Sequence, residues 1–217
     1  MPRWCARVAT RSMRSAPNRS IHARPSSRKS PKAWEGSGDR KLMRVLEGDC
    51  LVQRWCVSHR ADPAVARLAD RHYNRQKPGT PQFVPPGSCA VFLTDCGRAF
   101  WVTSAPFARW VRHAWAGAWV CSAFRSEGAG VASYLIRQAV AATRAHYGEP
   151  PEIGMITFID RKKVPPIRHR GAPLWGYSYR KAGFVEVGET KGGLLALQLL
   201  PGAMPGPLAA QSRSIWQ

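Results

Sequence analysis

Acidic residues are scarce in this sequence: Asp and Glu number 13 against 33 Lys and Arg, so the formal net charge of the 217-residue chain is +20. A surface with so little negative charge favours polyanionic partners, and nucleic acid is the commonest polyanion in cells. We therefore predict DNA as a partner. Composition alone leaves one alternative open, that GC-rich coding has enriched arginine without any such function.

Long apolar runs and paired cysteines are also missing. No stretch approaches the roughly 18 to 20 apolar residues of a membrane-spanning helix, so we expect a soluble protein with no membrane partner. The six cysteines form no CxxC pair and no Cys/His group, so neither a zinc site nor a disulfide framework is predicted. A reducing cytoplasm fits this cysteine usage.

The first 40 residues lack apolar periodicity. Residues 1–40 carry ten basic residues against two acidic ones, with Ser and Pro scattered among them. Such a segment cannot bury enough apolar surface to fold alone, so we predict a disordered basic arm. Two alternatives stay open: a spurious extension upstream of a true start at Met43, or a mitochondrial targeting peptide. Residues 41–203 are predicted to form one domain and residues 204–217 a flexible tail.

Strand and helix signals alternate after about residue 41. Asp62 followed by Pro63 predicts the N-cap and first position of a helix that ends near Tyr73. Turn residues between two β-rich runs predict a hairpin. Together the signals predict an α/β domain. The predicted strands are residues 51–57, 89–94, 99–104, 119–124, 153–159, 184–189 and 194–200, and the predicted helices are residues 63–73, 130–147 and 175–181.

The segment with the clearest chemistry is Arg125-Ser126-Glu127-Gly128-Ala129-Gly130, which joins a predicted strand to the long helix. A strand, glycine turn and helix junction directs free backbone N–H groups and the positive helix end to one spot, which suits a pyrophosphate. Glycine matters at positions 128 and 130 because a side chain would hold the phosphate away from the backbone. We therefore predict a phosphate-binding loop here.

This loop resembles motif A of the GNAT N-acyltransferase superfamily, R/Q-x-x-G-x-G/A, through Arg125, Gly128 and Gly130. A second segment, Tyr179-Arg180-Lys181-Ala182-Gly183-Phe184, resembles the closing signature of the same family, Y-x-K-x-G-F. The two motifs are about 50 residues apart and in the expected order. The resemblance covers roughly residues 50–200 and implies a GNAT-like mixed central sheet flanked by helices.

The GNAT resemblance also implies a cofactor, acetyl-CoA or another acyl-CoA. Its pyrophosphate would bind the backbone of residues 125–130, and its pantetheine would lie beside residues 119–124, which include Cys121 and Ser122. In this family the tyrosine that Tyr179 matches often protonates the departing thiolate. The alternative is that the ring of Tyr179 only packs beneath Phe184.

The chain departs from the GNAT pattern before motif A, where residues 116–124 offer no carboxylate base. Glu127 lies inside the phosphate loop, where its charge suits a helix N-terminus better than proton transfer. Asp160 closes the apolar strand 153–159, and ligands meet open α/β sheets at such strand ends. We therefore predict Asp160 as a catalytic carboxylate.

A second predicted cluster is His72-Tyr73-Asn74-Arg75, where the first helix runs into a Pro-rich stretch. An imidazole, a phenol and a guanidinium at one place can converge on a substrate, since His titrates near neutrality and Arg engages phosphate. His72 and Tyr73 are thus predicted catalytic residues and Arg75 a nucleic-acid contact. The alternative is a polar cluster that only ends the helix.

In the features that depart from the usual GNAT pattern, the chain resembles one GNAT branch, the Mom-type phage proteins that modify adenine in DNA. The similarity is carried by His72-Tyr73, by Asp160 after motif A, and by the YR-x-x-GF element at Tyr179 to Phe184. It implies transfer of a small carbon-nitrogen group to the exocyclic amine of adenine, with iron as a candidate cofactor. It also implies the cytoplasm of a bacterium or a phage-infected host cell.

A basic segment follows Asp160 directly and would draw a polyanionic substrate to the same centre. Its predicted nucleic-acid contacts are Arg161, Lys162, Lys163, Arg168 and Arg170. Three readings of function remain: a GNAT-fold acyltransferase-like enzyme acting on nucleic acid, a conventional acetyl-CoA-dependent N-acetyltransferase of a protein or small amine, and a binding module without catalysis. The first is our prediction from sequence, because it accounts for both the missing strand carboxylate and motif A.

Overall fold

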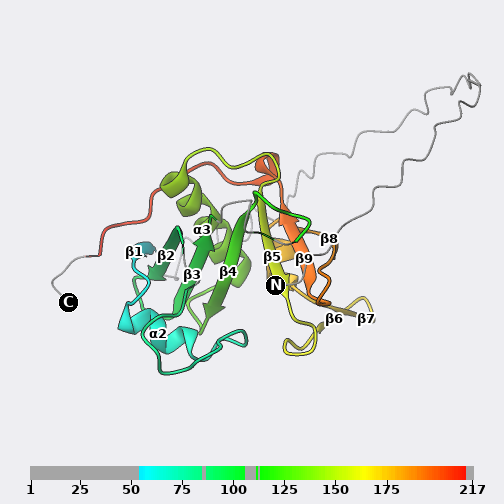
Figure 1. Cartoon of the computed structure of the whole chain (residues 1–217), viewed down its shortest axis with the longest axis horizontal. Helices are drawn as coiled ribbons and strands as arrows, with labels where there is room; N and C mark the ends of the chain where they lie inside the picture. Colours follow the sequence, from blue (N-terminus) through cyan, green and yellow to red (C-terminus); the bar gives the residue numbers. More distant parts are fainter. Residues whose placement is uncertain (1–53, 85–86, 106–110, 112, 214–217) are drawn as a thin grey trace, which may run out of the picture. The chain divides into compact units, whose positions relative to one another are not determined.

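The computed structural model describes residues 54–84, 87–105, 111 and 113–213, so the predicted basic arm lies outside the described residues (Figure 1). The elements run β1(Trp55–Ser58), α2(Pro63–Ala69), β2(Cys89–Thr94), β3(Ala99–Ser104), β4(Trp119–Ser126), α3(Ala132–Tyr147), β5(Met155–Ile159), β6(Ile167–His169), β7(Ala172–Leu174), α4(Tyr177–Lys181), β8(Val185–Glu189), β9(Leu195–Leu199) and the 3-10 turn η2(Pro201–Ala203). None of the helices in this part of the chain is long and apolar enough to cross a membrane.

Seven strands form one sheet in the order β1-β2-β3-β4-β5-β9-β8, and β6 pairs with β7 in a separate hairpin. Within the large sheet, β4 and β5 pair in parallel, whereas the other neighbouring strands pair antiparallel. The sheet is therefore mixed, and the predicted α/β class with a mixed central sheet is confirmed.

Side chains of successive strand residues alternate between the two faces of the sheet. Phe92 and Trp101 face α3, whose Leu135, Ile136 and Val140 are buried in the same cluster. On the other face, Val91 and Phe100 join the buried side of α2. The sheet thus separates two apolar layers, with α3 on one face and α2 on the other (Figure 1).

A β-bulge interrupts this alternation in the middle of β4. Val102 of β3 faces Ala123, but the next residue, Thr103, faces Cys121, so Ser122 is the extra residue. As a result Cys121 and Phe124 both pack with the α3 layer, while Ala123 packs with the α2 layer. Bulges that re-aim side chains are frequent beside active sites.

The parallel strands β4 and β5 diverge beyond this bulge. Their register runs from Trp119 opposite Met155 to Cys121 opposite Thr157, whereas β4 continues to Ser126 and β5 to Ile159. The described backbone of the outer half of β4 therefore faces β5 without pairing to it. Both carboxyl ends lie at this edge, which is where open α/β sheets bind ligands.

Several predicted boundaries need correction. The first helix ends at Ala69 rather than near Tyr73, and α3 begins at Ala132 rather than at Gly130. The predicted N-cap is confirmed, because the Asp62 carboxylate accepts a hydrogen bond from the N–H of Ala64 at 2.8 Å. Sequence analysis missed the β6–β7 hairpin. Its two strands are short and mostly exposed, and the segment is basic.

The first part of the predicted tail lies against the domain. The N–H of Leu208 donates to Ala141 at 3.1 Å, and Gln211 bonds to both Trp55 and Val57 of β1 at 2.8 Å. Arg213 then pairs with the carboxylate of Asp62. Residues 204–213 therefore cover part of the edge strand β1, and residues 214–217 lie outside the described residues.

Candidate functional site

A cavity of about 500 Å³ opens where β4 and β5 diverge. Three parts of the chain line it: residues 71–73 after α2, residues 121–125 of β4, and the segment from Thr157 to Tyr179. Cavities of roughly 300 to 1,000 Å³ are typical of small-molecule sites. The cavity brings together seven of the predicted site residues: His72, Tyr73, Cys121, Ser122, Arg125, Lys163 and Tyr179.

Tyr179 and Cys121 form a buried polar pair in the wall of this cavity. The Tyr179 hydroxyl lies 3.4 Å from the sulfur of Cys121, and the hydroxyl of Thr157 donates to the Cys121 carbonyl at 3.3 Å. Burial raises the pKa of Cys121 to about 12 and the pKa of Tyr179 well above its ordinary value. Both groups therefore keep their protons at neutral pH, so Tyr179 suits proton donation and Cys121 does not suit nucleophilic attack.

His72 and Tyr73 line the same cavity. Their rings are 4.5 Å apart between centroids, and the Tyr73 hydroxyl donates to the carbonyl of Phe158 at 3.1 Å. Burial lowers the pKa of His72, a hydrogen bond to Asn74 opposes that shift, and the nearby Arg125 charge adds to it. The imidazole is therefore neutral at pH 7 and able to accept a proton.

Glu127 lies at the mouth of the cavity between two arginines. Arg71 donates to both of its carboxylate oxygens at 2.7 Å, and Nε of Arg125 donates to Oε1 at 2.7 Å. These hydrogen bonds lower the pKa of Glu127 to about 2. The carboxylate is thus an ion-pair partner that fixes Arg71 and Arg125, whereas sequence analysis favoured a helix N-terminal charge over a base.

The glycine loop lies next to this ion-pair cluster rather than along the cavity wall. Gly128 and Gly130 have φ of +75° and +120°, which side chains rarely adopt, and a Cβ at Gly128 would lie 2.9 Å from the guanidinium of Arg98. Ser126 belongs to β4, and Ala129 is buried in the α3 layer. Arg98 is a cation near the loop that sequence analysis did not identify.

Asp160 lies beside the cavity but does not line it. Its carboxylate accepts a hydrogen bond from the N–H of Lys162 at 2.9 Å and lies 3.9 Å from the ammonium of Lys163. Its carbonyl accepts from the N–H of Val164. These contacts shape the turn after β5, so Asp160 sets the position of Lys163, and its predicted catalytic role stays a prediction.

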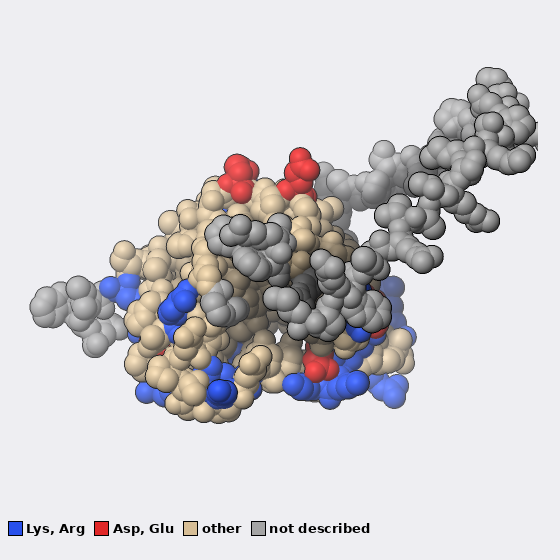
Figure 2. All heavy atoms as spheres, in the orientation of Figure 1, with Lys and Arg blue, Asp and Glu red and all other residues tan. Residues whose placement is uncertain are grey.

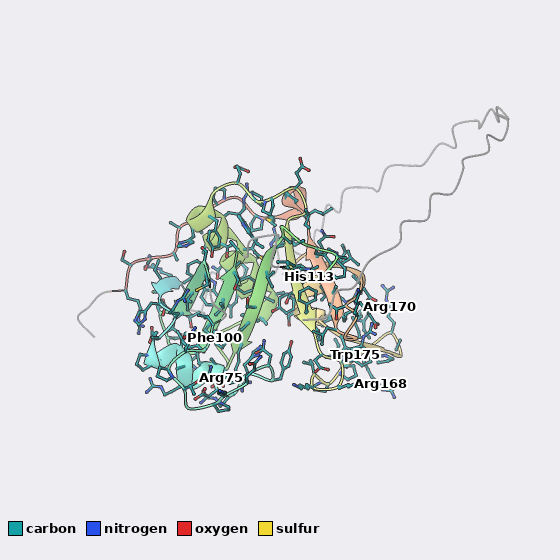
Figure 3. All side chains as sticks on the ribbon, viewed as in Figure 1. Arg75, Phe100, His113, Arg168, Arg170 and Trp175 are labelled. Carbon is teal, nitrogen blue, oxygen red and sulfur yellow. The ribbon has the colours of Figure 1, made fainter. Side chains whose placement is uncertain are left out.

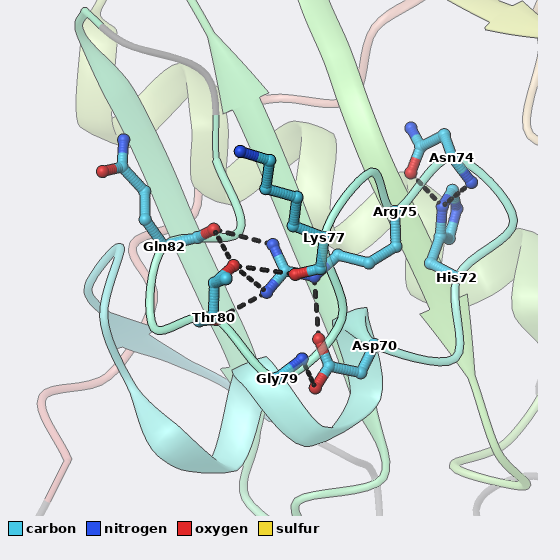
Figure 4. A network of polar contacts seen from close by, with 8 residues as sticks. All are labelled: Asp70, His72, Asn74, Arg75, Lys77, Gly79, Thr80 and Gln82. Atoms are coloured by element: carbon cyan, nitrogen blue, oxygen red, sulfur yellow. Dashed lines mark hydrogen bonds and ion pairs between the residues drawn. The ribbon is translucent and has the colours of Figure 1, made fainter.

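Arg75 is held inside the Pro-rich loop rather than presented to solvent (Figure 4). Its Nε donates to Asp70 at 2.7 Å, Nη1 to the carbonyl of Gln82 at 2.7 Å, and Nη2 to the carbonyl of Thr80 at 2.5 Å. Its side chain is only 7% exposed. These contacts occupy every nitrogen of the guanidinium, so Arg75 organises the loop and is not placed to bind a phosphate.

Arg161 is also committed to internal contacts. Its guanidinium pairs with Glu186 and Glu189 of β8 and lies 5.5 Å from the ring of Trp175. Trp175 in turn donates to the carbonyl of Val164 at 2.9 Å. Arg161 therefore anchors the base of the segment that carries the β6–β7 hairpin.

The remaining basic residues of this segment are exposed. Lys162, Arg168 and Arg170 have no acidic partner within the part of the chain that the structure describes. Arg168 and Arg170 lie on the outer side of the domain, beyond Trp175 (Figure 3). Figure 2 shows basic side chains at this end and elsewhere along the lower part of the view, with two acidic groups at the top and another among the basic ones below. We call Lys162, Lys163, Arg168 and Arg170 the hairpin basic surface.

A second cavity, of about 390 Å³, lies on the α2 side of β4. Loop residues 74–84 and Phe100 of β3 line it. His72, Ser122 and Ala123 border both cavities, so the two meet at the bulge of β4. Sequence analysis missed this cavity, although the apolar Phe83 and Val84 in a Pro-rich loop were a signal.

Metal binding has little support in the described residues. The iron that the Mom resemblance raises would need a cluster of His, Cys, Asp or Glu side chains. Among the residues described, no group of three such side chains is arranged to hold an ion. No step below uses a metal.

The chain matches no protein-family model, and no curated protein or solved structure is significantly similar to it. The site is therefore interpreted from its own geometry and from the two sequence motifs.

Proposed function

We propose that the protein is a GNAT-fold N-acyltransferase that acts on nucleic acid, with modification of adenine in DNA as the narrower form of the proposal. The divergence of β4 and β5 around the Tyr179 hydroxyl carries this proposal. An extended arm that contains amide groups can pair with a strand backbone. The outer half of β4 does not pair with β5, although the Asn74 amide donates to the carbonyl of Ser122 at 2.9 Å. A thioester beside β4 would then lie close to a phenol able to donate a proton.

The charges at the cavity rim support an acyl-CoA as cofactor. Arg71, Arg125 and Lys163 line the cavity, and Nη1 of Arg71 and Nη2 of Arg125 have no hydrogen-bond partner among the described residues, so these groups are able to bind phosphate oxygens. The Gly128 and Gly130 loop before α3 adds a backbone that side chains would block. When bound, acyl-CoA would supply an acyl group activated as a thioester.

Two residues of the chain, Tyr179 and His72, would then transfer the two protons of the reaction. Tyr179 keeps its proton at neutral pH and is placed to give it to the sulfur that leaves. His72 is neutral and can accept the proton that the attacking amine releases. Because these two groups line the same cavity, neither a metal nor a carboxylate is required for proton transfer.

The hairpin basic surface supports nucleic acid as the acceptor. Ile167 and Leu174 face each other across the β6–β7 hairpin and line the cavity, so the hairpin forms its lip. Arg168 lies on the other face of the same strand, as alternation requires. A phosphate backbone bound outside the hairpin would therefore hold its bases near the cavity.

The test is mass spectrometry of nucleosides from plasmid DNA of bacteria that express the protein, beside a Tyr179→Phe variant. We expect a new adenine-derived mass with the wild type and a yield reduced about 100- to 10,000-fold in the variant, the range of general acid catalysis. The variant keeps the ring contacts with Phe124 and Phe184, so its fold should be unchanged. Unmodified DNA from cells that contain folded wild-type protein would contradict the proposal.

A conventional acetyl-CoA-dependent N-acetyltransferase of a protein or small amine is the second candidate. The same cavity and Tyr179 would serve it, and it would not need the hairpin basic surface. Calorimetric binding of acetyl-CoA combined with unmodified DNA would favour this candidate.

A further inference from the structure

We infer that the second cavity is the acceptor pocket and that it takes an uncharged heterocyclic amine, the exocyclic amine of a single nucleobase turned out of its strand. The inference rests on the proposed function and names the acceptor's binding place. It depends on the position of the cavity, on the side chains that line it and on the absence of acidic groups among its described lining residues.

The position of the second cavity beside the first supports this inference. The two cavities share His72, Ser122 and Ala123 as lining residues, so they meet at the bulge of β4. An acyl group in the first cavity and an amine in the second would both lie beside the His72 imidazole. His72 is thus the described ring best placed to take a proton between them.

The lining of the second cavity suits a flat ring with polar edges. Phe83 and His72 both approach Phe100 edge-on, with centroid distances of 6.4 and 6.2 Å, so aromatic groups form one side. Gln76 and Gln82 of the exposed loop also line this cavity, and the Gln82 amide lies 3.4 Å from the carbonyl of Val84. Aromatic rings stack on bases, and amide side chains pair with the donor and acceptor edge of adenine.

The loop that carries these amides has a fixed shape. Arg75 ties the carbonyls of Thr80 and Gln82 to Asp70, and Asp70 also accepts from the N–H of Gly79 at 2.9 Å (Figure 4). A loop held at several points needs little ordering when a ligand binds. This gives the residue predicted as a phosphate contact a different role, as the support of the pocket wall.

The charges around the two cavities disfavour the cationic acceptors of usual amine acetylation, because the five lining cations outnumber the three carboxylates, Glu127, Asp70 and Asp160, that pair with four of them. Neither cavity has Asp or Glu among its described lining residues, whereas Arg71, Arg125 and Lys163 line the first and Arg75 and Lys77 the second. A lysine or polyamine acceptor carries an ammonium that these cations repel. The exocyclic amine of a base is uncharged at neutral pH and enters without that cost.

The transfer balances with the groups present. The amine nitrogen forms a bond to the thioester carbonyl carbon, and the carbon–sulfur bond breaks with its electron pair on sulfur. One proton passes from nitrogen to His72, and another passes from Tyr179 to sulfur. The products are an amide and a free thiol, and solvent restores the two residues.

The test separates base binding from backbone binding. A single-stranded oligonucleotide that carries one adenine beside a 2-aminopurine, and a terminal fluorescein, reports by 2-aminopurine fluorescence when the adenine leaves the stack, and reports total binding by anisotropy. Gln76→Leu combined with Gln82→Leu removes both amides but keeps the Gln82 carbonyl that Arg75 binds. We expect the fluorescence titration to shift at least about tenfold, the factor for losing one paired base contact, with the anisotropy titration unchanged. Gln211→Leu on β1's covering segment is the matched control and should shift neither.

The outcomes distinguish this inference from the proposed function. Equal fluorescence titrations for the wild type and the double variant, in protein that binds acetyl-CoA, would overturn the acceptor pocket and leave the proposed function standing. Transfer to a lysine-containing peptide as fast as to the oligonucleotide would overturn the preference for uncharged amines. A protein that binds the oligonucleotide but no acyl-CoA would instead contradict the proposed function.

Discussion

The carboxylate of Glu127 accepts hydrogen bonds from both Arg71 and Arg125. The stability of these contacts at the cavity rim therefore depends on pH. Each arginine donates at 2.7 Å, so the ionised carboxylate is stabilised in the folded chain and the pKa of Glu127 falls from its ordinary 4.5 to about 2. Arg125 also donates to the carbonyl of Arg71 at 2.7 Å. The three residues therefore hold the end of β4 against the segment that follows α2.

Glu127→Gln should be less stable than the wild type above pH 4.5, and the difference should shrink as the pH falls toward 2. A folded-state pKa below the unfolded one adds stability above the unfolded value, and that stability is lost as the pH falls through the folded value. Urea unfolding at several pH values measures this. Glu152→Gln, which removes an exposed carboxylate from the connection between α3 and β5, is the control. A Glu127→Gln deficit that persists unchanged at pH 2 would mean that the ion pairs contribute nothing.

At the scale of elements, one glycine determines how closely the short helix α4 packs against the sheet. Gly176 precedes α4 with φ of +68°, and a Cβ there would lie 2.4 Å from Leu197 and 2.6 Å from Ile159, both buried side chains of β9 and β5. Gly176 therefore lets α4 approach the sheet closely. This approach brings Tyr179 to within hydrogen-bonding distance of Cys121.

Gly176→Ala should lower the free energy of unfolding by about 2 to 4 kcal/mol, from backbone strain and overpacking together. Gly171→Ala is the matched control, because Gly171 has φ of +83° but no atom within 4 Å of its Cβ position, so only the strain applies. The measurement is the urea midpoint of each variant. Equal losses would show that the contact with Leu197 and Ile159 relaxes freely and does not position α4.

Elements that depend on local patterns were predictable, and contacts between elements were not. The strands 89–94 and 99–104 match β2 and β3 because β-rich runs flank a clear turn. The bulge at Ser122 depends on the partner strand and leaves no local mark in the sequence. The motifs did indicate His72 and Tyr179, which meet at one cavity.

Charged residues were harder to interpret from sequence for the same reason. The cluster at residues 72–75 and the basic segment after Asp160 predicted where positive charge lies, but not which cations are free. Arg75 donates hydrogen bonds to Asp70 and to two loop carbonyls, and Arg161 forms ion pairs with Glu186 and Glu189. Those partners are distant in sequence or lie on the backbone, so a list of basic residues cannot distinguish an anchor from a binding group.

At the scale of the whole molecule, a net charge of +20 predicts attraction to polyanions but not a binding place. In the described part of the chain, Lys162, Arg168 and Arg170 combine exposure with freedom from acidic partners, and Lys163 is 59% exposed beside Asp160. These basic residues belong to the segment whose Ile167 and Leu174 line the cavity. Long-range attraction would then deliver a nucleic acid to the cavity rather than to the surface at large.

Replacing Lys162, Lys163 and Arg168 together with Gln should weaken binding to all DNA sequences and reduce the slope of log Kd against log salt concentration by about 2 to 3, because each phosphate contact contributes about 0.9. Fluorescence anisotropy at several salt concentrations measures this. Replacing Arg54, Arg60 and Arg67 with Gln changes the net charge equally but acts near β1 and α2. If both triple variants flatten the slope to the same degree, binding follows the total charge and the hairpin is not its site. A flattened slope in the first variant alone would locate the phosphate contacts on the hairpin basic surface.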